Sequence, residues 1–500
     1  MTRARLLVAN RGEIALRIFR ACREMGIETV AVFSDADRNA AHVAAADRAV
    51  RLGPAPARES YLCVPAILAA ARQAGAGLIH PGYGFLSESA AFARACGDAG
   101  LTWVGPSPEA IEAMGSKTGS RQLMEKAGVP VVPGMTHPAS GPAQIAVFAR
   151  KAGFPILLKA SAGGGGKGMR RVEGEGEIAS AFERARSEAQ AFFGDDAVYA
   201  EKLVDRPRHV EVQVVGDLRG QRAAVGEREC SLQRRHQKVV EECPSPAVNG
   251  ALRERLCAAA LTAADAVGYT SCGTVEFLLA ADGSFYFLEM NTRLQVEHPV
   301  TEEVWGVDLV REMIAIALGE PLSFMPGELS PRGHAIECRI YAEDPLAGFA
   351  PSPGIVTGLR LPQGPGVRND VGIETGSAVS IDYDPMLGKL IVHGQSRAAA
   401  LTRLSRALVE YEISGVATTL PLFRALLADA EFAAAAFDVQ WLDRWLASGH
   451  LAAAVGAPAD GEVLLAAAGL AQMEGAASIL HEDGDSLWRR VARRESLRGR

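Results

Sequence analysis

The sequence predicts a multidomain protein of mixed α/β and α+β class that begins with a doubly wound domain. Three observations support this fold class. The chain has 500 residues, enough for about three domains. Short apolar segments alternate with segments of helical spacing over residues 1–115, the pattern of a parallel sheet covered by helices. Over residues 206–335 strand-like segments predominate instead, which is typical of an α+β region.

The first 115 residues show a repeated βαβ pattern. Residues 5–10 form an apolar strand, residues 13–25 have the apolar spacing of a helix, and Thr29–Phe33 is a second strand. Further units of the same kind follow at Ala66–Gln73, Leu78–His80, Ala90–Ala99 and Thr102–Val104. Asn10-Arg11-Gly12-Glu13 stands where a dinucleotide-binding domain carries its glycine fingerprint, so a dinucleotide site is not indicated.

The rest of the chain divides by its pattern into three further parts. Residues 116–130 are predicted as a helix that ends near Gly128. Other expected elements are strands at Ile156–Lys159, Val198–Glu201, Val210–Val215, Thr274–Leu279, Ser284–Glu289 and His334–Tyr341, and a helix at 308–318. We therefore expect domains at 1–115, 116–335 and 336–446, and a solvated or disordered tail, alanine-rich and then arginine-rich, at 447–500.

The composition is that of a globular protein and argues against several classes of partner. Hydrophobic residues make up 48% of the chain and charged residues 22%, as in soluble domains. The net charge of −7 gives no reason to expect a nucleic-acid partner. The first apolar run is too short for a signal peptide, and no uncharged stretch reaches the length of a membrane helix. Eight scattered cysteines without a Cys-x-x-Cys motif indicate reduced thiols, so we expect a cytoplasmic protein with no membrane partner.

A glycine-rich segment, Gly163-Gly-Gly-Gly166-Lys167-Gly168, follows the strand at Ile156–Lys159. It formally matches Gly-x-Gly-x-x-Gly, but Met169–Glu173 predicts another strand where a dinucleotide loop would open a helix. It is not a Walker A loop, because glycine follows Lys167 where Ser or Thr is required. The remaining interpretation is a mobile flap whose backbone N–H groups approach phosphate oxygens, with a flexible hairpin tip as the alternative.

Polar residues alternate with apolar ones from residue 289 onward. The odd positions are Glu289, Asn291, Arg293, Gln295 and Glu297, which are side chains that bind metals and oxyanions. A half-solvated surface strand gives the same alternation. On a strand the first two lie about 7 Å apart, whereas the two glutamates at the ends lie about 26 Å apart. If both serve one site, the strand must end near residues 292–293 and continue as a polar loop.

Several charged residues of the expected strands need a partner. Lys159 ends an apolar strand, where an anionic phosphate would neutralise it, and Lys117 is a second candidate phosphate contact. Glu276 stands in the middle of an apolar strand, so it needs a cation or a hydrogen-bond donor. Together with Glu289 it suggests a divalent metal held with substrate phosphates, whereas internal salt bridges to arginine or lysine are the alternative.

Four long motifs stand in order along the chain: His80-Pro-Gly-Tyr-Gly-Phe-Leu-Ser-Glu88, Lys159-Ala-Ser-Ala-Gly-Gly-Gly-Gly-Lys-Gly-Met, Glu229-Cys-Ser-Leu-Gln-Arg-Arg-His-Gln-Lys238 and Glu289-Met-Asn-Thr-Arg-Leu-Gln-Val-Glu-His-Pro. Together they resemble biotin carboxylase, the ATP-grasp component or α-subunit of biotin-dependent acyl-CoA carboxylases, over about residues 3–446. The resemblance implies an ATP-grasp region at 116–335, with a mobile glycine-rich lid at about 131–205, and a C-terminal biotin carboxylase domain at 336–446.

The resemblance also implies an activity and its cofactors. The family uses ATP, with Mg²⁺ or Mn²⁺, and bicarbonate to make carboxyphosphate, and then carboxylates N1′ of biotin. Biotin is a carrier-bound substrate. The residues implied as ATP contacts are Lys117, Lys159, Gly163, Gly164, Gly165, Gly166, Glu201, Lys202, Leu203, His209, Gln233 and His236. The implied metal ligands are Glu276 and Glu289, with Asn291 beside them.

The remaining implied roles concern bicarbonate and biotin. The implied bicarbonate pocket consists of Lys238, Arg293, Gln295 and the Val296 backbone. Glu297 would deprotonate bicarbonate, Arg339 would steady the biotin enolate, and Tyr83 would lie near biotin. These roles suit the residue types, because a positioned carboxylate can accept a proton and arginine offers a planar, permanently charged fork.

The chain contains no Met-Lys dipeptide, so the usual Ala-Met-Lys-Met biotin attachment site is absent. We therefore expect biotin to be presented by a separate biotin carboxyl carrier domain or protein, and not to be attached here. The resemblance further implies a carboxyltransferase partner and a homodimer. The segment 447–500 weakly resembles a linker that precedes further domains.

Two alternatives to the carboxylase stay open. One is another ATP-grasp ligase, such as one that acts on a purine precursor, which Gln295-Val-Glu297-His and Arg339 disfavour. The other is a non-catalytic subunit that binds nucleotide and assembles with a carboxyltransferase. No candidate ligand has been replaced by an inert residue, which argues against this second alternative.

Overall fold

The structure, a computed structural model, describes residues 4–135, 137–160, 169–193 and 195–455. Residues Met1–Ser448 form one compact unit and Gly449–Arg500 a second. The described part of the second unit includes helix α16 (His450–Val455), and most of the tail predicted to be solvated or disordered lies outside the described residues. Within the described ranges, no helix combines the length and the apolar character needed to cross a membrane.

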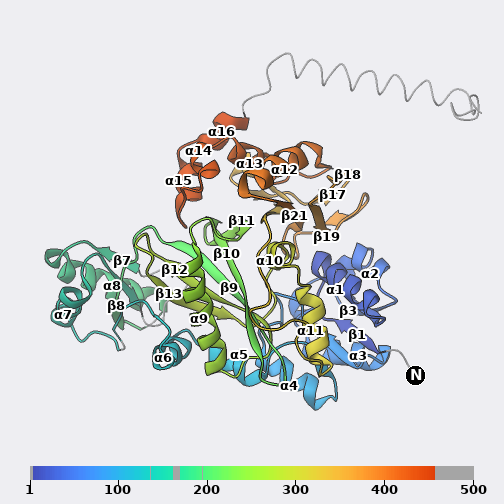
Figure 1. Ribbon diagram of the computed structural model, residues 1–500, viewed down its shortest axis with the longest axis horizontal. Helices are drawn as coiled ribbons and strands as arrows, with labels where there is room; N and C mark the ends of the chain where they lie inside the picture. The colour runs from blue at the N-terminus through green and yellow to red at the C-terminus, as the bar shows by residue number, and fades with distance from the viewer. Residues whose placement is uncertain (1–3, 136, 161–168, 194, 456–500) are drawn as a thin grey trace, which may run out of the picture. The chain divides into compact units, whose positions relative to one another are not determined.

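The N-terminal part of the first unit is a parallel sheet covered on both faces, as the alternation of strands and helices predicted (Figure 1). Its strand order is β3-β2-β1-β4-β5, and its strands are β1 (Arg5–Val8), β2 (Glu28–Ser34), β3 (Arg48–Gly53), β4 (Leu78–His80) and β5 (Thr102–Trp103). Its helices are α1 (Gly12–Glu24), α2 (Ala41–Ala45), α3 (Val64–Ala74), α4 (Ala90–Asp98) and α5 (Pro108–Gly115), with short 3₁₀ turns η1 (Asp35–Asp37) and η2 (Ala57–Glu59).

Both faces of β1 are buried because its side chains alternate. Leu6 and Val8 pack with α1 residues such as Ile18, whereas Leu7 packs on the opposite face with Ile67 of α3. This two-sided burial is why β1 appears in the sequence as an uninterrupted apolar run. The doubly wound fold class of the N-terminal part is confirmed.

A small three-stranded sheet carries the glycine-rich segment. Its order is β7-β6-β8, with β6 (Ile156–Ala160), β7 (Met169–Val172) and β8 (Val198–Lys202). The strands β6 and β7 are antiparallel and pair Ile156 with Val172, as expected for a strand–loop–strand flap. The loop between them, with Gly163–Gly166, lies outside the described residues. The accompanying helices are α7 (Pro142–Ala152) and α8 (Ile178–Phe193), with η3 (Glu175–Glu177), whereas α6 (Lys117–Ala127) packs with α9 (Gly250–Ala266) and β13 (Phe285–Asn291).

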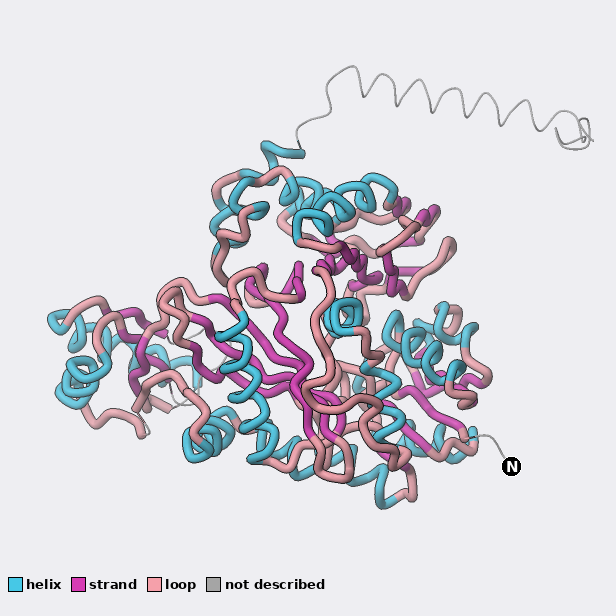
Figure 2. Tube along the Cα trace, in the orientation of Figure 1, coloured by secondary structure: helices cyan, strands magenta, loops and turns pink. Residues whose placement is uncertain are grey.

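The largest sheet is antiparallel and has eight strands in the order β13-β12-β9-β10-β11-β14-β21-β19. Their bounds are β9 (Arg208–Gly216), β10 (Arg222–Arg234), β11 (Gln237–Cys243), β12 (Ser271–Leu279), β13 (Phe285–Asn291), β14 (His334–Tyr341), β19 (Val367–Val371) and β21 (Met386–Gly394). Figure 2 shows these strands side by side, with helices on the flanks. Because β11 pairs with β14, the sheet continues across the predicted boundary at 335/336.

Helices and short strands complete the first unit. Helix α9 (Gly250–Ala266) buries Leu256 and Ala260 against the strands β9 and β12. The other helices are α10 (His298–Trp305), α11 (Leu309–Ala317), α12 (Arg397–Glu410), α13 (Leu420–Leu427), α14 (Ala430–Ala433), α15 (Trp441–Ala447) and η4 (Pro345–Ala347). The other strands are β15 (Glu343–Asp344), β16 (Ala350–Pro351), β17 (Gly354–Ile355), β18 (Gly358–Arg360), β20 (Ala378–Val379) and β22 (Glu412–Ser414).

A bulge in β10 lets helix α10 approach the sheet closely. The register of β10 against β9 shifts between Ala224 and Glu227. Gly226 lies in this bulge with φ +68°, and a Cβ placed on it would lie 2.1 Å from the indole ring of Trp305 at the end of α10. Only glycine combines this backbone conformation with so little space.

Candidate active site

The segment that follows β13 is a polar loop, as predicted. The strand ends at Asn291, and residues 292–297 connect it to α10. Glu88 holds the start of this loop, because its carboxylate accepts hydrogen bonds from the Thr292 backbone at 3.1 Å and from Arg293 Nε at 3.0 Å. Arg293 Nη2 also donates to Asn291 Oδ1 at 2.8 Å. The loop therefore starts in a defined geometry fixed by side chains.

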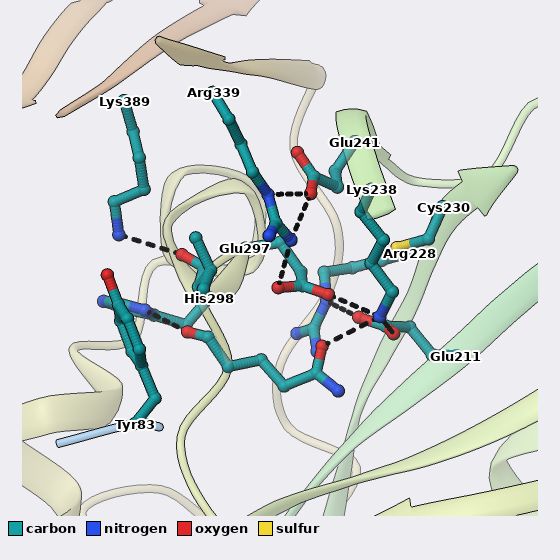
Figure 3. A network of polar contacts seen from close by, with 12 residues as sticks. Tyr83, Glu211, Arg228, Cys230, Lys238, Glu241, Glu297, His298, Arg339 and Lys389 are labelled. Atoms are coloured by element: carbon teal, nitrogen blue, oxygen red, sulfur yellow. Dashed lines mark hydrogen bonds and ion pairs between the residues drawn. The ribbon is translucent and has the colours of Figure 1, made fainter. Parts of the chain in front are cut away.

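Glu297 lies at the end of the loop between two cations (Figure 3). Lys238 Nζ lies 2.6 Å from one carboxylate oxygen and Arg339 Nη2 lies 3.0 Å from the other. The residue is 2% exposed. Burial alone would favour the protonated acid, but the two cations outweigh it and hold the pKa of Glu297 below its usual value. The carboxylate is therefore ionised and able to accept a proton.

Lys238 joins Glu297 to the strands behind it. Its ammonium also contacts Glu211 at 2.6 Å, Glu276 at 2.8 Å and Gln295 at 3.2 Å. Burial lowers its pKa, but the three carboxylates outweigh burial and raise the pKa well above the usual value. The lysine is therefore permanently charged, and it offers a cationic centre for an anion in this part of the site.

Two buried arginines, Arg228 and the Arg339 already described, orient the carboxylates. Arg228, which is wholly buried, donates to Glu211 at 2.5 Å and to Gln213, Thr274 and Thr301 at 2.8–3.0 Å. Arg339 Nε donates to Glu241 at 2.6 Å. Burial raises the pKa of Glu241 to about 7 even though this arginine opposes the shift. Such buried charges are stable only because each has several partners.

The predicted metal ligands lie on adjacent strands. Glu276 on β12 stands opposite Glu289 on β13 in the register of the sheet. Glu276 Oε1 accepts hydrogen bonds from Lys238, Asn291 and Gln295, and its other oxygen lies 3.0 Å from His209 Nε2. The alternative of internal salt bridges is therefore realised for Glu276. Two carboxylates and an amide are oxygen ligands of the kind that Mg²⁺ uses, so this set fits the metal.

Other described ligand atoms also cluster. His209, Glu211 and Glu276 form one group with ligand atoms within 4.8 Å of one another, and Glu211, Cys230 and Glu297 form a second. Lys238 contacts all three of the glutamates. Glu211 also pairs with Arg228, Glu297 with Arg339, and Glu276 with His209, so each carboxylate has cationic partners without a metal ion.

The predicted nucleotide contacts lie on two sheets. Lys159, Glu201 and Lys202 belong to the three-stranded sheet, whereas His209 and Gln233 belong to the eight-stranded sheet. The sequence predicted an anionic phosphate as the partner of Lys159 on β6. In this structure its anionic partner is the carboxylate of Glu201 on β8. Arg121 Nη1 donates to the same Glu201 at 2.9 Å. Lys202 Nζ donates to the Phe154 carbonyl at 2.9 Å, and the Leu203 N–H donates to the Pro155 carbonyl at 3.1 Å.

His209 and Gln233 interact on neighbouring strands at 3.0 Å. Burial lowers the pKa of His209, but Glu276 outweighs it and raises the pKa above the usual value. His236 is exposed at the turn between β10 and β11, where it and Arg235 have φ of +68° and +50°. Two consecutive non-glycine residues in this left-handed region are strained.

The side chain of Lys117 lies outside the described residues.

A cavity of about 410 Å³ opens beside the loop. It is lined by Tyr83, Arg293, Val296 and Arg339 together with residues of the N-terminal part such as Asn10 and Glu13. The hydroxyl of Tyr83 donates to Glu13. The residues that the resemblance connected with biotin, Tyr83 and Arg339, thus line the same cavity as Arg293 and Val296, whereas the other two candidate bicarbonate residues, Lys238 and Gln295, are not among its lining residues.

Sequence reasoning assigned no role to several residues of this network. They are Glu13, Glu88, Glu211, Arg228, Glu241 and Lys389. One signal could have found some of them, namely a charge within an apolar strand. Glu211 stands in His-Val-Glu-Val-Gln-Val-Val and Lys389 in Leu-Gly-Lys-Leu-Ile-Val, and a buried charge needs a partner.

Comparison with known proteins accords with this architecture. Family models match three consecutive segments: the biotin carboxylase N-terminal domain at residues 2–111, the ATP-binding domain of the carbamoyl-phosphate synthase L chain at 116–325 and the biotin carboxylase C-terminal domain at 337–444. The fold and the site thus define an enzyme built around an ATP-grasp nucleotide-binding region. The chain belongs to the biotin carboxylase family.

Individual relatives are similar over most of their length. A pyruvate carboxylase subunit from Methanothermobacter thermautotrophicus is 51% identical over 443 residues, which cover 88% of this chain and 90% of the relative. Biotin carboxylase of Halalkalibacterium halodurans is 51% identical over 430 residues, covering 86% and 95%. The crystal structure of a biotin carboxylase complex from Campylobacter jejuni superimposes with a TM-score of 0.81 at 44% identity, covering 88% and 98%.

A second solved structure is a complex with nucleotide and bicarbonate. It is the biotin carboxylase domain dimer of the 2-oxoglutarate carboxylase of Hydrogenobacter thermophilus, in complex with MgADP, ADP and bicarbonate. Its TM-score is 0.80 at 43% identity, covering 89% of this chain and 98% of that chain.

Proposed function

We propose that this chain carboxylates biotin in a reaction that consumes ATP and bicarbonate and passes through carboxyphosphate. The observation that carries the proposal is the buried, ionised carboxylate of Glu297, flanked by Lys238 and Arg339 beside the cavity. A carboxylate in this setting can take a proton from an acid within hydrogen-bond reach. Membership of the biotin carboxylase family supports the same reaction.

Bicarbonate binds, in this proposal, to Lys238, Arg293, Gln295 and the backbone of Val296. Glu297 takes the proton of bicarbonate, and the freed oxygen attacks the γ-phosphorus of ATP, which releases ADP and leaves carboxyphosphate. Arg293 and Val296 line the cavity, which supports their exposure to a small anion. Lys238 supplies positive charge close to the negative charge that develops during phosphoryl transfer. Stabilising that charge is the main requirement of the reaction.

Biotin occupies the cavity in the second step, in which the carboxyl group of carboxyphosphate passes to N1′ of biotin and the phosphate that leaves takes the N1′ proton. Arg339 holds the enolate oxygen of biotin, because a guanidinium keeps its charge at any working pH. Its pKa stays well above the usual value because Glu241 and Glu297 outweigh burial. Tyr83 lines the same cavity, which supports its place near biotin.

The nucleotide is proposed to contact the three-stranded sheet β7-β6-β8, helix α6, strands β9 and β10 and the turn that follows β10. Its contacts are Lys117, Lys159, the glycines 163–166, Glu201, Lys202, Leu203, His209, Gln233 and His236. Glu276 and Glu289, with Asn291 beside them, would hold Mg²⁺ or Mn²⁺, which neutralises phosphate charge when bound. Lys159 would exchange its present partner Glu201 for a phosphate oxygen.

We further propose the partners that such a reaction needs. Biotin arrives on a separate carrier domain or protein, because no Met-Lys attachment site is present, and a carboxyltransferase uses the carboxybiotin. A homodimer is proposed from the dimeric structure of the related domain. All eight cysteines are free, which supports a reducing, cytoplasmic setting. We also propose domain boundaries at 115/116, 335/336 and 446/447.

The test is an assay of the purified chain with MgATP. Phosphate release is measured with and without bicarbonate, then with free biotin and with a separately supplied biotinylated carrier, and gel filtration reports the assembly. We expect release that depends on bicarbonate and increases with biotin. Turnover that ignores biotin at saturating Mg²⁺ would contradict the proposal. Carboxylation of an aminoimidazole in place of biotin would indicate another ATP-grasp ligase, and ATP binding without phosphate release would indicate a non-catalytic subunit.

A further inference from the structure

Two buried side chains hold consecutive backbone carbonyls of the loop at 292–297. The carbonyl oxygen of Gln295 lies 2.7 Å from Nδ1 of His298, and the carbonyl oxygen of Val296 lies 2.9 Å from Nζ of Lys389. Figure 3 shows both residues beside Glu297. His298 and Lys389 are both 0% exposed, and neither lines the cavity. His298 therefore acts on the site through the backbone, and Lys389 acts through the backbone and through Glu13 and Tyr83, which line the cavity.

These contacts determine where the backbone N–H groups point. A peptide group is planar and trans, so its C=O and N–H point in opposite directions. Holding the carbonyl of Gln295 fixes the direction of the Val296 N–H, and holding the carbonyl of Val296 fixes the N–H of Glu297. Val296 lines the cavity together with Arg293 and Arg339. The oriented N–H of Val296 thus belongs to the peptide that borders the candidate anion site.

The imidazole ring of His298 makes one hydrogen bond among the described residues, to the carbonyl of Gln295. Burial and the nearby cations Lys389 and Arg17 hold its pKa well below the usual value, so the ring is neutral. A neutral ring carries one N–H, and because a carbonyl oxygen can only accept, that hydrogen lies on Nδ1. Nε2 has no hydrogen-bond partner within the described residues. The ring therefore satisfies the carbonyl of Gln295 and does no acid–base work.

Lys389 joins three parts of the chain at one point. It lies on β21, opposite Arg339 of β14 in the register of the sheet. Its ammonium lies 3.3 Å from the carboxylate of Glu13 on α1, and it donates to Val296 in the loop. A wholly buried ammonium is costly unless it is paired, and Glu13 supplies the compensating charge. The carbonyl of Val296 is thus held by a cation that the rest of the molecule keeps in place.

We propose that His298 and Lys389 are positioning residues of the bicarbonate site, which aim the Val296 N–H and hold Glu297 in orientation through the carbonyls of Gln295 and Val296. The inference rests on the proposed function, which assigns bicarbonate to the Val296 backbone. Neither residue touches a reacting atom. Their loss should therefore weaken the use of bicarbonate and leave ATP binding unaffected.

The test compares two near-isosteric substitutions of the histidine. The amide nitrogen of asparagine takes the place of Nδ1, whereas that of glutamine takes the place of Nε2. We expect His298→Gln to raise the KM for bicarbonate about ten-fold, as the loss of one good hydrogen bond implies, with the KM for ATP nearly unchanged. His298→Asn should stay close to the unmodified enzyme. Equal effects of the two variants would overturn the positioning role.

Lys389→Met gives an independent measurement with a matched control. Arg397→Met removes a half-buried cation of the C-terminal part, which pairs with Glu242 at 2.7 Å and makes no hydrogen bond to the loop among the described residues. We expect Lys389→Met to raise the KM for bicarbonate selectively, whereas Arg397→Met should lower only the unfolding temperature. Similar kinetics for both variants would overturn the proposal. An unmodified enzyme without bicarbonate-dependent turnover would instead overturn the proposed function.

Discussion

The charge of Glu297 is decided by two cations within hydrogen-bond reach of its carboxylate. Lys238 and Arg339 each bind one of its oxygens, so the carboxylate stays ionised despite its burial. Glu297 and Lys238 lie in two of the four motifs, and Arg339, which lies outside them, was identified through the family resemblance. Sequence reasoning could not identify Lys389 or Glu13, whose importance depends on which strands meet in space. A local sequence pattern identifies residues of a given type, but it does not predict which distant segments of the chain come into contact.

The first prediction concerns the proposed base. Glu297→Gln keeps the size of the side chain and removes its charge and its ability to accept a proton. We expect bicarbonate-dependent phosphate release to fall about 10²–10³-fold, because a single electrostatic or acid–base group contributes about that factor. The binding of ATP, measured by calorimetry, should stay nearly unchanged. A variant with the full carboxylation rate would show that another group takes the proton.

The second prediction separates the two half-steps at Arg339. Arg339→Ala leaves Lys238 bound to Glu297, so deprotonation of bicarbonate should continue at a reduced rate. Biotin carboxylation should fall further, by about 10²-fold, because the enolate loses its counter-charge. The measurement is phosphate release without biotin beside carboxybiotin formation with biotin. Equal losses in both assays would contradict the division of roles.

At the scale of elements, a strand with several charged residues in a row is the hardest to predict. The strand at Leu78–His80 was predicted with its correct bounds as a short apolar run, and so was His334–Tyr341, in which the buried charges Glu337 and Arg339 are separated by an apolar residue. No strand was predicted for β10, whose centre contains Glu227, Arg228 and Glu229. All three are buried, and their ion-pair partners come from other strands or helices. Charged residues that pair across elements interrupt the alternation of apolar and polar residues. Because strand prediction depends on that alternation, such a strand is missed.

The third prediction concerns the bulge that seats α10. Gly226→Ala would place a Cβ 2.1 Å from the Trp305 ring and force a left-handed backbone on alanine. We expect a loss of about 1–3 kcal/mol in the free energy of unfolding, as in overpacked cores. Gly220→Ala is the matched control, because Gly220 also has positive φ but has no atom within 4 Å of its Cβ position. Denaturant unfolding measures both, and an equal loss would show that crowding contributes nothing.

At the scale of the whole molecule, the site is assembled from segments that lie far apart in the chain. The loop is held by Glu88 from the N-terminal part and by Lys389 and Arg339 from β21 and β14. The doubly wound part could be predicted from periodicity, since each of its strands pairs with near neighbours in parallel order. The eight-stranded sheet could not, because its strand order joins segments from residue 208 to residue 394, and no local pattern specifies such pairing.

The fourth prediction concerns acid stability. Burial lowers the pKa of His42 to about 4 in the folded protein, whereas an unfolded histidine titrates near 6.5. Between these values the unfolded chain binds the extra proton, so stability falls as pH falls, by about 1.4 kcal/mol per pH unit for this residue. His42→Gln should remove that part of the slope in denaturant unfolding between pH 6.5 and 4.

The comparison with the variant is essential because other groups act in the opposite direction. Burial raises the pKa of Glu13 and of Glu241 to about 7, so these two favour the folded state as pH falls through that range. The difference between the two slopes isolates His42. An identical slope in both proteins would mean that this histidine is protonated, or unprotonated, equally in the folded and unfolded states.

The three-way support of the catalytic loop has a consequence for the protein during its synthesis. The chain emerges from its N-terminus, so the segment up to residue 291, with its proposed nucleotide contacts, is made well before Arg339 and Lys389. Until those two strands dock, the carboxylate of Glu297 lacks one of its cations and its backbone lacks a brace. An unfinished polypeptide therefore lacks part of the support of Glu297, and we expect it to consume nucleotide more slowly than the completed protein.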